Sequence, residues 1–181
     1  MTAPDHDAPE EVKWEGRFIT AKKRGRWEYV SRSRGIRAAA ILAVDESNHV
    51  LLVEQYRVPL GRSCIELPAG LIGDEEGAEG EDPLQAAGRE LEEETGYRAA
   101  NLEDLGTFYS SPGMVSESFT LVRASNLTKV GEGGGVEGEN ITVHRVAIDQ
   151  IREFLAAKRA EGCGIDVRML LLLGQGFIAG E

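Results

Sequence analysis

Three glutamates at helical spacing form the most chemically suggestive pattern in the sequence: Glu90, Glu93 and Glu94. At about 100° per residue, their side chains fall within one arc of roughly 100° on a helix. Carboxylates on a shared helix face repel one another unless a cation lies between them. Mg²⁺ prefers oxygen ligands and commonly completes its shell with water and substrate phosphates. The pattern therefore indicates a divalent-metal site, and a solvated face of an acidic protein is the alternative.

The flanking residues predict the helix that would position these carboxylates. Asp82 can cap its N-terminus, Pro83 fits the first helical position, and Gly96 can end it in a left-handed conformation. Arg89 lies four residues before Glu93 and can hold that side chain, but one guanidinium cannot neutralise three carboxylates. The arc next to the glutamates is apolar and is expected to face a core; it carries Leu84, Ala87 and Leu91.

Composition limits the class of protein and its partners. The chain has 181 residues, 41% of them hydrophobic, which is enough for one globular domain. No apolar run approaches the roughly 20 residues of a membrane span, and residues 1–7 lack the pattern of a secretory signal, so we expect a cytoplasmic protein with no membrane partner. The net charge of −11 argues against nucleic acid as a partner. A bound Mg²⁺ would locally reverse the sign of an acidic cleft and admit a phosphate substrate.

The chain divides into three parts in order. Residues 1–11 are interpreted as a disordered acidic tail, residues 12–35 as an N-terminal hairpin, and residues 36–181 as the main domain. The hairpin is expected to have two strands, at residues 13–20 and 26–32, joined by the basic turn 21–25. An isolated two-stranded ribbon is marginal, so its two tryptophans need a cover. They could pack on the same domain, or across a dimer with one ring left to stack on a base.

The main domain mixes strands and helices without a regular alternation, which indicates a mixed α/β fold. A glycine-rich segment at residues 130–139 is expected to be a mobile loop. The sequence pattern predicts strands at residues 36–44, 50–57, 64–68, 101–109, 118–123 and 141–146. It predicts helices at residues 82–96, 149–161 and 166–177.

The glutamate segment resembles the Nudix box, G-x5-E-x7-R-E-U-x-E-E-x-G-U with U a bulky apolar residue. From Glu81 to Tyr97 the match holds position by position. The expected glycine position holds Glu75, and we interpret Gly73–Gly80 as containing a five-residue insertion. Further segments resemble the ADP-ribose pyrophosphatase branch of this family, so that the resemblance covers residues 13–180. These segments are Trp27–Arg32, Glu54–Arg57, Ile65–Leu71 and Ser111–Gly113, with Pro112 sixteen residues after Gly96.

The resemblance implies a fold and a reaction. The fold would be an α/β/α Nudix sandwich preceded by a small N-terminal antiparallel sheet, which this branch exchanges across a homodimer. The reaction would be Mg²⁺-dependent hydrolysis of the diphosphate of ADP-ribose or another nucleoside diphosphate sugar, giving a nucleoside monophosphate and a sugar phosphate. Mn²⁺ could substitute for Mg²⁺. The alternatives are a nucleoside triphosphate or dinucleoside polyphosphate hydrolase of the same family, or a catalytically silent module that senses a nucleotide.

The resemblance also implies roles for individual residues. The metal ligands would be Glu90, Glu93, Glu94 and the carbonyl of Ala69. The catalytic residues would be Glu139, Glu93 and Arg89, with Glu139 the first candidate for the general base, ahead of Glu117 and a box glutamate. The substrate-binding residues would be Trp14, Trp27, Arg32, Arg57, Pro112, Gly113 and Glu117.

Overall fold

The computed structural model describes residues 4–33, 36–73, 81–136 and 138–179, so the inserted segment expected within Gly73–Gly80 lies almost entirely outside the described residues. The strands of the two larger sheets are β4 (Arg37–Ala43), β5 (His49–Arg57), β6 (Arg62–Glu66), β7 (Ala69–Ile72), β8 (Tyr97–Tyr109), β9 (Ser118–Lys129), β10 (Thr142–Ala147) and β11 (Gly164–Ile165). The α-helices are α1 (Pro83–Thr95), α2 (Ile151–Ala160) and α3 (Leu170–Ala179). Short 3-10 helices are η2 (Val58–Leu60), η3 (Ile148–Gln150) and η4 (Val167–Met169). Among the described residues, no helix is long and apolar enough to cross a membrane.

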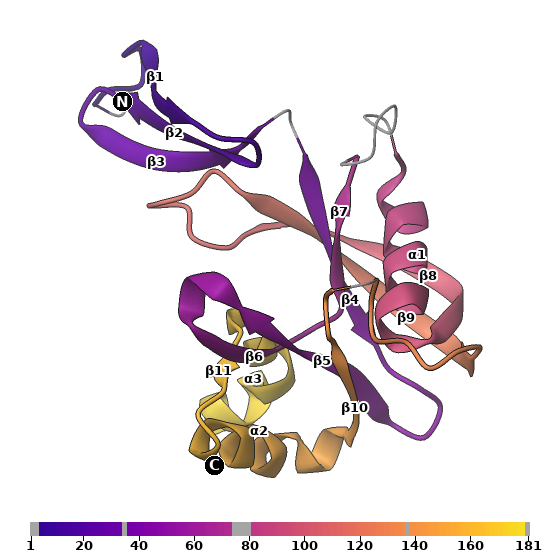
Figure 1. Cartoon of the computed structure of the whole chain (residues 1–181). Helices are drawn as coiled ribbons and strands as arrows, with labels where there is room; N and C mark the ends of the chain where they lie inside the picture. Colours follow the sequence, from indigo (N-terminus) through magenta and orange to yellow (C-terminus); the bar gives the residue numbers. More distant parts are fainter. Residues whose placement is uncertain (1–3, 34–35, 74–80, 137, 180–181) are drawn as a thin grey trace.

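Two four-stranded mixed sheets form the centre of the molecule (Figure 1). One has the order β7-β4-β9-β8, in which β4 and β9 run parallel and the outer pairs are antiparallel. The other has the order β10-β5-β6-β11, in which only β6 and β11 run parallel. The predicted strands are present, but β8 begins at Tyr97, directly after α1, and both β8 and β9 are longer than the sequence pattern indicated.

Alternating side chains of the central strands pack into two separate cores. Ala39 and Ile41 of β4 lie in the core under α1, together with Leu91 of that helix. Ala40 of β4 faces the other way, into a core that includes Leu155 of α2 and further side chains of α3. Burying each large apolar side chain contributes about 1.5–3 kcal/mol. Helices on both faces make the expected α/β/α sandwich, and Figure 1 shows α1 on the opposite side from α2 and α3.

The N-terminal unit is a three-stranded antiparallel sheet, not the expected two-stranded hairpin. Its strands are β1 (Glu10–Glu15), β2 (Ile19–Arg24) and β3 (Trp27–Arg32). The expected basic turn is wrong, because residues 21–24 belong to β2 and the chain turns at Gly25, where φ is 57°. Glu10, which was assigned to the tail, accepts hydrogen bonds from Lys22 (2.8 Å) and Arg24 (3.1 Å). Such cross-strand pairs of opposite charge stabilise a sheet even where its residues look like turn formers.

The N-terminal sheet is attached to the sandwich through one strand. The Val30 N–H donates to the carbonyl of Met114 (3.0 Å), and the Ser116 N–H donates to the carbonyl of Val30 (2.9 Å). The hydroxyls of Ser31 and Ser116 are 2.7 Å apart. These contacts fix β3 against the loop between β8 and β9. They thereby place residues from the start of the chain beside residues that follow α1.

Candidate functional site

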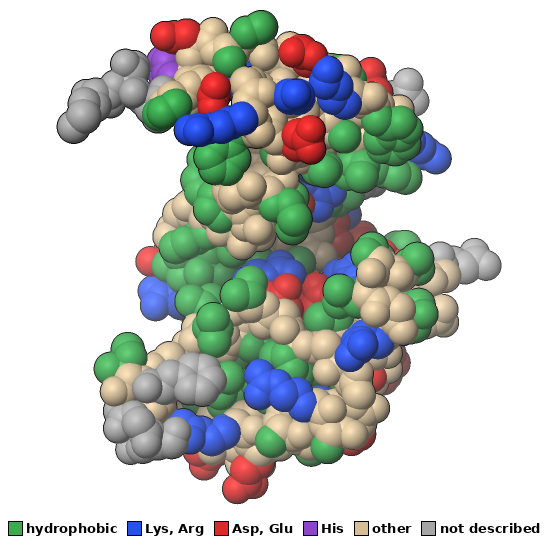
Figure 2. Space-filling view, turned by 90° about the vertical axis from the view of Figure 1, so that its left-hand side faces the viewer, with side chains coloured by type: hydrophobic (Ala, Val, Ile, Leu, Met, Phe, Trp, Pro, Cys, Tyr) green, Lys and Arg blue, Asp and Glu red, His purple; other side chains and the backbone are tan. Residues whose placement is uncertain are grey.

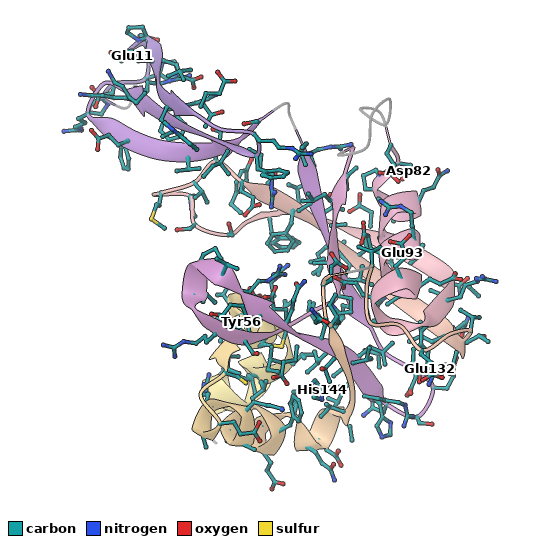
Figure 3. All side chains as sticks on the ribbon, viewed as in Figure 1. Glu11, Tyr56, Asp82, Glu93, Glu132 and His144 are labelled. Atoms are coloured by element: carbon teal, nitrogen blue, oxygen red, sulfur yellow. The ribbon has the colours of Figure 1, made fainter. Side chains whose placement is uncertain are left out.

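Helix α1 carries the glutamates, and its ends are those that the sequence predicted. The Asp82 carboxylate accepts the Leu84 N–H (2.9 Å), Pro83 occupies the first turn, and Gly96 ends the helix at φ 73° with its N–H donating to Glu92. The apolar side of the helix packs on β4 and β9 through Ala87 and Leu91, with Leu84 at its edge. This packing turns the glutamate face toward the middle of the molecule (Figure 3).

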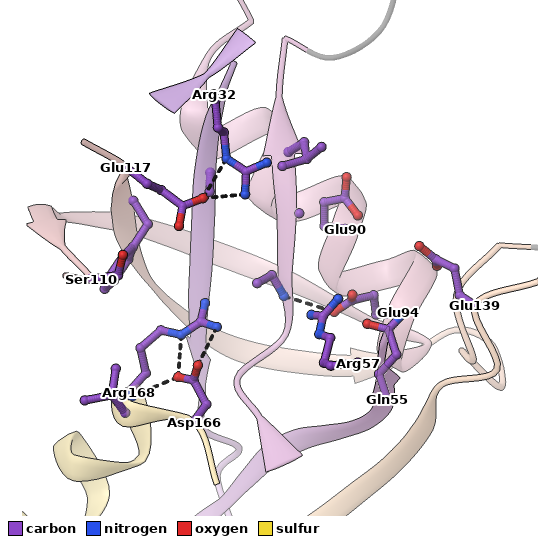
Figure 4. Close-up of a pocket in the computed structure, with 16 residues that line it drawn as sticks. Arg32, Gln55, Arg57, Glu90, Glu94, Ser110, Glu117, Glu139, Asp166 and Arg168 are labelled. Atoms are coloured by element: carbon purple, nitrogen blue, oxygen red, sulfur yellow. Dashed lines mark hydrogen bonds and ion pairs between the residues drawn. The ribbon is translucent and has the colours of Figure 1, made fainter. Parts of the chain in front are cut away.

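A cavity of about 480 Å³ lies against that face. Figure 2 shows the molecule hollowed at mid-height, with acidic and basic side chains at the floor of the hollow. The charged residues that line the cavity come from both ends of the chain and from the centre (Figure 4). They are Arg32, Arg57, Glu90, Glu94, Glu117, Glu139, Asp166 and Arg168. Five carboxylates against three guanidiniums leave the cavity wall with an excess of negative charge.

Glu94 is the most buried of the box glutamates, with only 6% of its surface exposed. Its Oε2 accepts the N–H of Ala69 (3.0 Å) at the start of β7. Burial raises the pKa of Glu94 to about 8, and the neighbouring carboxylates of Glu90 and Glu139 add to the rise. A buried carboxylate between like charges favours a positively charged neighbour.

Arg89 contacts three other carboxylates of the box. Its Nη1 donates to Glu90 (2.9 Å) and lies 3.5 Å from Glu93, and its Nη2 lies 3.7 Å from Glu81. Glu81 in turn accepts the Gly73 N–H at 3.3 Å. Arg89 therefore contacts more carboxylates than the single one expected from the spacing. The pairing with Glu93 holds that side chain at the edge of the site, 40% exposed and outside the cavity lining.

The donor set of the cavity matches a hard cation. Glu90, Glu94 and Glu139 all line it and supply only oxygen, and burial, followed by the like charges of Glu90 and Glu139, raises the pKa of Glu94. In the described residues, no three acidic, histidine or cysteine side chains already converge closely enough to hold a metal ion. The structure thus brings together Glu90, Glu94 and Ala69 at the cavity, and it leaves Glu93 at the rim.

Gly70 allows Glu90 to take its position in the cavity. A Cβ atom on Gly70 would lie 2.0 Å from the Cδ of Glu90, which is far inside van der Waals contact. The backbone of β7 thus lies close to the side chain of a box glutamate at this glycine. Any side chain at position 70 would displace the Glu90 carboxylate from the wall.

The glycine-rich segment expected to be a mobile loop is docked on the C-terminal end of α1. The N–H groups of Gly134 and Gly135 donate to the carbonyls of Glu94 (2.8 Å) and Glu93 (3.1 Å). These carbonyls have no partner within the helix, so the loop acts as its C-terminal cap. Glu139 follows, and its Oε2 accepts the Val136 N–H (2.9 Å). The loop therefore sets the position of Glu139 relative to the glutamates of α1.

Two guanidiniums at the cavity, those of Arg57 and Arg168, donate hydrogen bonds to the same buried carboxylate. Glu66 accepts two hydrogen bonds from Arg57 (2.6 and 3.0 Å) and one from Arg168 (3.2 Å). Asp166 holds the other side of Arg168. The sequence indicated Arg57 but missed Arg168, because nothing in the spacing marks a residue of the last helical segment as a neighbour of β5.

The remaining expected residues lie around the attachment of the N-terminal sheet. Arg32 donates its Nε to Glu117 at 2.6 Å, so these two residues form an ion pair across β3 and the loop between β8 and β9. Trp27 is 52% exposed and lines a separate groove of about 320 Å³ with Pro112 and Gly113. Trp14 lies on β1, is 57% exposed and does not line that groove. The two tryptophans are therefore not brought together within one chain.

Comparison with known proteins gives one family. The model of the NUDIX domain matches residues 34–162. A methanol dehydrogenase activator from Bacillus methanolicus is 38% identical over 67% of this chain and 64% of its own length. An ADP-ribose pyrophosphatase from Bacillus subtilis is 35% identical over 67% of this chain and 63% of its own length. The chain therefore spans less than two thirds of each of these two relatives.

Two further similar proteins are matched over a larger share of their own length. A GDP-mannose pyrophosphatase from Cronobacter sakazakii is 36% identical over 77% of this chain and 72% of its own length. A crystal structure of an ADP compounds hydrolase superposes with a TM-score of 0.68 at 22% identity, covering 95% of this chain and 92% of that one. At this identity the superposition concerns the fold, including the region of the N-terminal sheet.

The docking of the glycine loop leads to a stability prediction. A Cβ on Gly133 (φ 70°) would lie 2.4 Å from the backbone carbon of Thr95, whereas a Cβ on Gly61 (φ 63°) would meet nothing within 4 Å. Both alanine substitutions carry the same left-handed strain of about 1–2 kcal/mol. Gly133→Ala should therefore lower the free energy of unfolding in urea by at least about 1 kcal/mol more than Gly61→Ala.

The matched pair also tests the geometry locally. In Gly133→Ala the Gly134 and Gly135 amides should exchange faster with solvent, because the loop must leave the end of α1. Equal unfolding free energies for the two variants, with unchanged exchange at these amides, would contradict the docked position of the loop.

Proposed function

Because the chain belongs to the NUDIX family, we propose that it is a divalent-metal-dependent pyrophosphohydrolase acting on ADP-ribose or another nucleoside diphosphate sugar. The products would be a nucleoside monophosphate and a sugar phosphate. The observation that carries the proposal is that α1 carboxylates and the guanidiniums of Arg32 and Arg57 line the same cavity. Carboxylates that can hold a cation beside groups that can hold phosphate oxygens suit a diphosphate.

We propose Mg²⁺ as the metal, with Mn²⁺ as a substitute, and Glu90, Glu94 and the Ala69 carbonyl as ligands. Glu93 remains a proposed ligand that would have to leave Arg89 to reach the ion, since it lies at the rim. When bound, the ion would neutralise phosphate charge and lower the pKa of a coordinated water. Arg89 would keep Glu90 in place through its 2.9 Å hydrogen bond. The role of Arg89 is therefore positional in this proposal.

The chain's own residues would orient the diphosphate and remove the proton of the attacking water. Arg57 and Arg32 would donate to the phosphate oxygens or the adjoining ribose, from opposite walls of the cavity. Glu139 is the favoured general base, because its carboxylate lines the cavity and accepts one backbone N–H. Glu117 is less suited, because it is already paired with Arg32. This difference in pairing favours Glu139.

The N-terminal sheet supports the proposal of a homodimer. Its first strand is exposed along its whole length, and four large apolar side chains are more than half exposed: Val12, Trp14, Phe18 and Trp27. A sheet of three short strands with so little buried surface is expected to need a further partner. A second copy would cover these side chains, and it would bring its own Trp14 toward the Trp27 groove, where the two rings would hold a base.

A substrate panel tests the proposed reaction. The purified chain should be incubated in Mg²⁺ with ADP-ribose, GDP-mannose, ATP and a diadenosine polyphosphate, and the products separated by chromatography. We expect AMP and ribose 5-phosphate in equal amounts from ADP-ribose, and slower turnover of ATP and the polyphosphate. Preferred hydrolysis of ATP or of the polyphosphate would contradict the substrate class. No hydrolysis of any of them would contradict an enzymatic function.

The first substitution concerns the metal ligands. Glu94→Gln should lower kcat by at least about a hundredfold, a barrier increase of about 2.7 kcal/mol, because the ion loses a charged ligand. Glu92→Gln is the matched control, since Glu92 lies on the same helix but pairs with Arg98 at 2.8 Å outside the cavity. The control should retain parental kcat, and excess chelator should abolish turnover of the parent. Turnover that persists in chelator would exclude the metal mechanism.

The second concerns Trp27. Stacking on a base contributes about 1–3 kcal/mol, so Trp27→Ala should raise KM for ADP-ribose by about tenfold, with a smaller effect on kcat. The control is Tyr56→Ala, because Tyr56, labelled in Figure 3, is similarly exposed and lines neither the cavity nor the Trp27 groove. Equal KM values for the two variants would contradict a base-binding role for Trp27.

The dimer is tested by removing residues 1–34. Sedimentation should show the parent as a dimer and the truncated chain as a monomer with little activity. A truncated chain that stays active and sediments as a dimer would show that the sheet neither joins the subunits nor completes the site.

A further inference from the structure

The cavity contains a third guanidinium, that of Arg168, which the proposed mechanism does not use. Arg168 lies in η4, which Asp166 caps by accepting the Arg168 N–H at 2.8 Å. Its side chain folds back onto the same carboxylate through Nε (2.6 Å) and Nη2 (3.0 Å). A bidentate pair of this kind fixes both the position and the plane of the guanidinium.

Glu66 sets the distance between Arg168 and Arg57. It is 4% exposed and accepts hydrogen bonds from both guanidiniums. Moving either arginine would leave a buried carboxylate with less compensation, which is costly. In Figure 4, Arg57 lies between Arg168 and the carboxylates of Glu94 and Glu139. Arg168 is therefore held at the end of the cavity away from the proposed metal ligands. Arg57, which would bind the diphosphate, lies between.

The hydrogen-bonding groups at this end suit hydroxyls better than phosphate. Arg168 uses Nε and Nη2 for its carboxylates, and within the described ranges no hydrogen bond of its Nη1 is found. The Asp166 carboxylate beside it accepts hydrogen bonds but would repel a phosphate. The guanidinium also lies 5.6 Å from the centre of the Phe119 ring. A donor and an acceptor side by side, next to an aromatic ring, can engage adjacent hydroxyls of a sugar, each of which both donates and accepts.

We propose that Arg168 and Asp166 bind the hydroxyls of the sugar that leaves with the second phosphate, so that Arg168 determines specificity for that half of the substrate. This inference rests on the proposed function, because it needs a substrate with a sugar beyond the diphosphate. Arg57 would then act on the phosphates, and the shared Glu66 would position Arg57 and Arg168 for two parts of one ligand.

The test separates the two halves of the substrate by using the two products. Arg168→Lys keeps a cation between Asp166 and Glu66 but removes the free Nη1. Asp166→Asn, the second variant, removes the charge of the acceptor that also holds Arg168. The control is Arg123→Lys, because Arg123 is also paired with a carboxylate, that of Glu103, but does not line the cavity. The affinities of each variant for ribose 5-phosphate and for AMP are measured by calorimetry in Mg²⁺, together with KM and kcat for ADP-ribose.

We expect Arg168→Lys to lower the affinity for ribose 5-phosphate by about tenfold, which is the effect of losing one charge-assisted hydrogen bond. Its affinity for AMP and its kcat should stay within about twofold of the control. Asp166→Asn should show the same split between the products. If the parent hydrolyses ADP-ribose but the variants lose equal affinity for both products, or lose affinity for neither, the role of Arg168 is wrong while the proposed function stands. A parent that neither hydrolyses ADP-ribose nor binds ribose 5-phosphate would overturn the proposed function, and this inference with it.

Discussion

The site depends on one unfavourable arrangement: the Glu94 carboxylate is buried beside two other carboxylates. Burial and like charge raise its pKa to about 8, and its hydrogen bond from the Ala69 backbone compensates only part of this cost. Such a group is stable either when it binds a proton or when a cation lies close to it. A bound divalent cation would relieve the repulsion between Glu94 and the neighbouring carboxylates of Glu90 and Glu139. The proposed metal dependence is thus a consequence of how the helix is packed.

The surrounding backbone keeps this arrangement in place. The apolar face of α1 is packed on β4 and β9, so the helix cannot rotate its glutamates toward solvent without exposing its core. The start of β7 lies close because Gly70 has no side chain, and the glycine loop caps the carbonyls at the other end of the helix. Arg89 lies against the carboxylates of Glu90, Glu93 and Glu81, whereas the buried Glu94 carboxylate accepts the Ala69 N–H. These backbone contacts hold α1, the start of β7 and the glycine loop together around the cavity.

Features that depend only on neighbouring residues along the chain could be predicted from the sequence. The bounds of α1 follow from Asp82, Pro83 and Gly96, and the glutamate face follows from helical spacing. The α/β/α fold came from a motif resemblance and is confirmed. Contacts between distant parts of the chain could not be predicted this way: Arg168 reaches Arg57 only because η4 follows β11 onto the sheet beside β6. The third N-terminal strand was missed for a similar reason, since Lys22 and Arg24 look like turn residues until Glu10 lies opposite them.

The central claim, that a divalent cation compensates the buried charge of Glu94, is tested most directly by urea unfolding with and without Mg²⁺. At a Mg²⁺ concentration a hundred times the dissociation constant, the parent chain should gain about 2.7 kcal/mol in the free energy of unfolding. Glu92→Gln should gain the same amount, and Glu94→Gln should gain little or nothing. An equal gain in Glu94→Gln and the parent, or no gain in the parent at any Mg²⁺ concentration, would contradict the account.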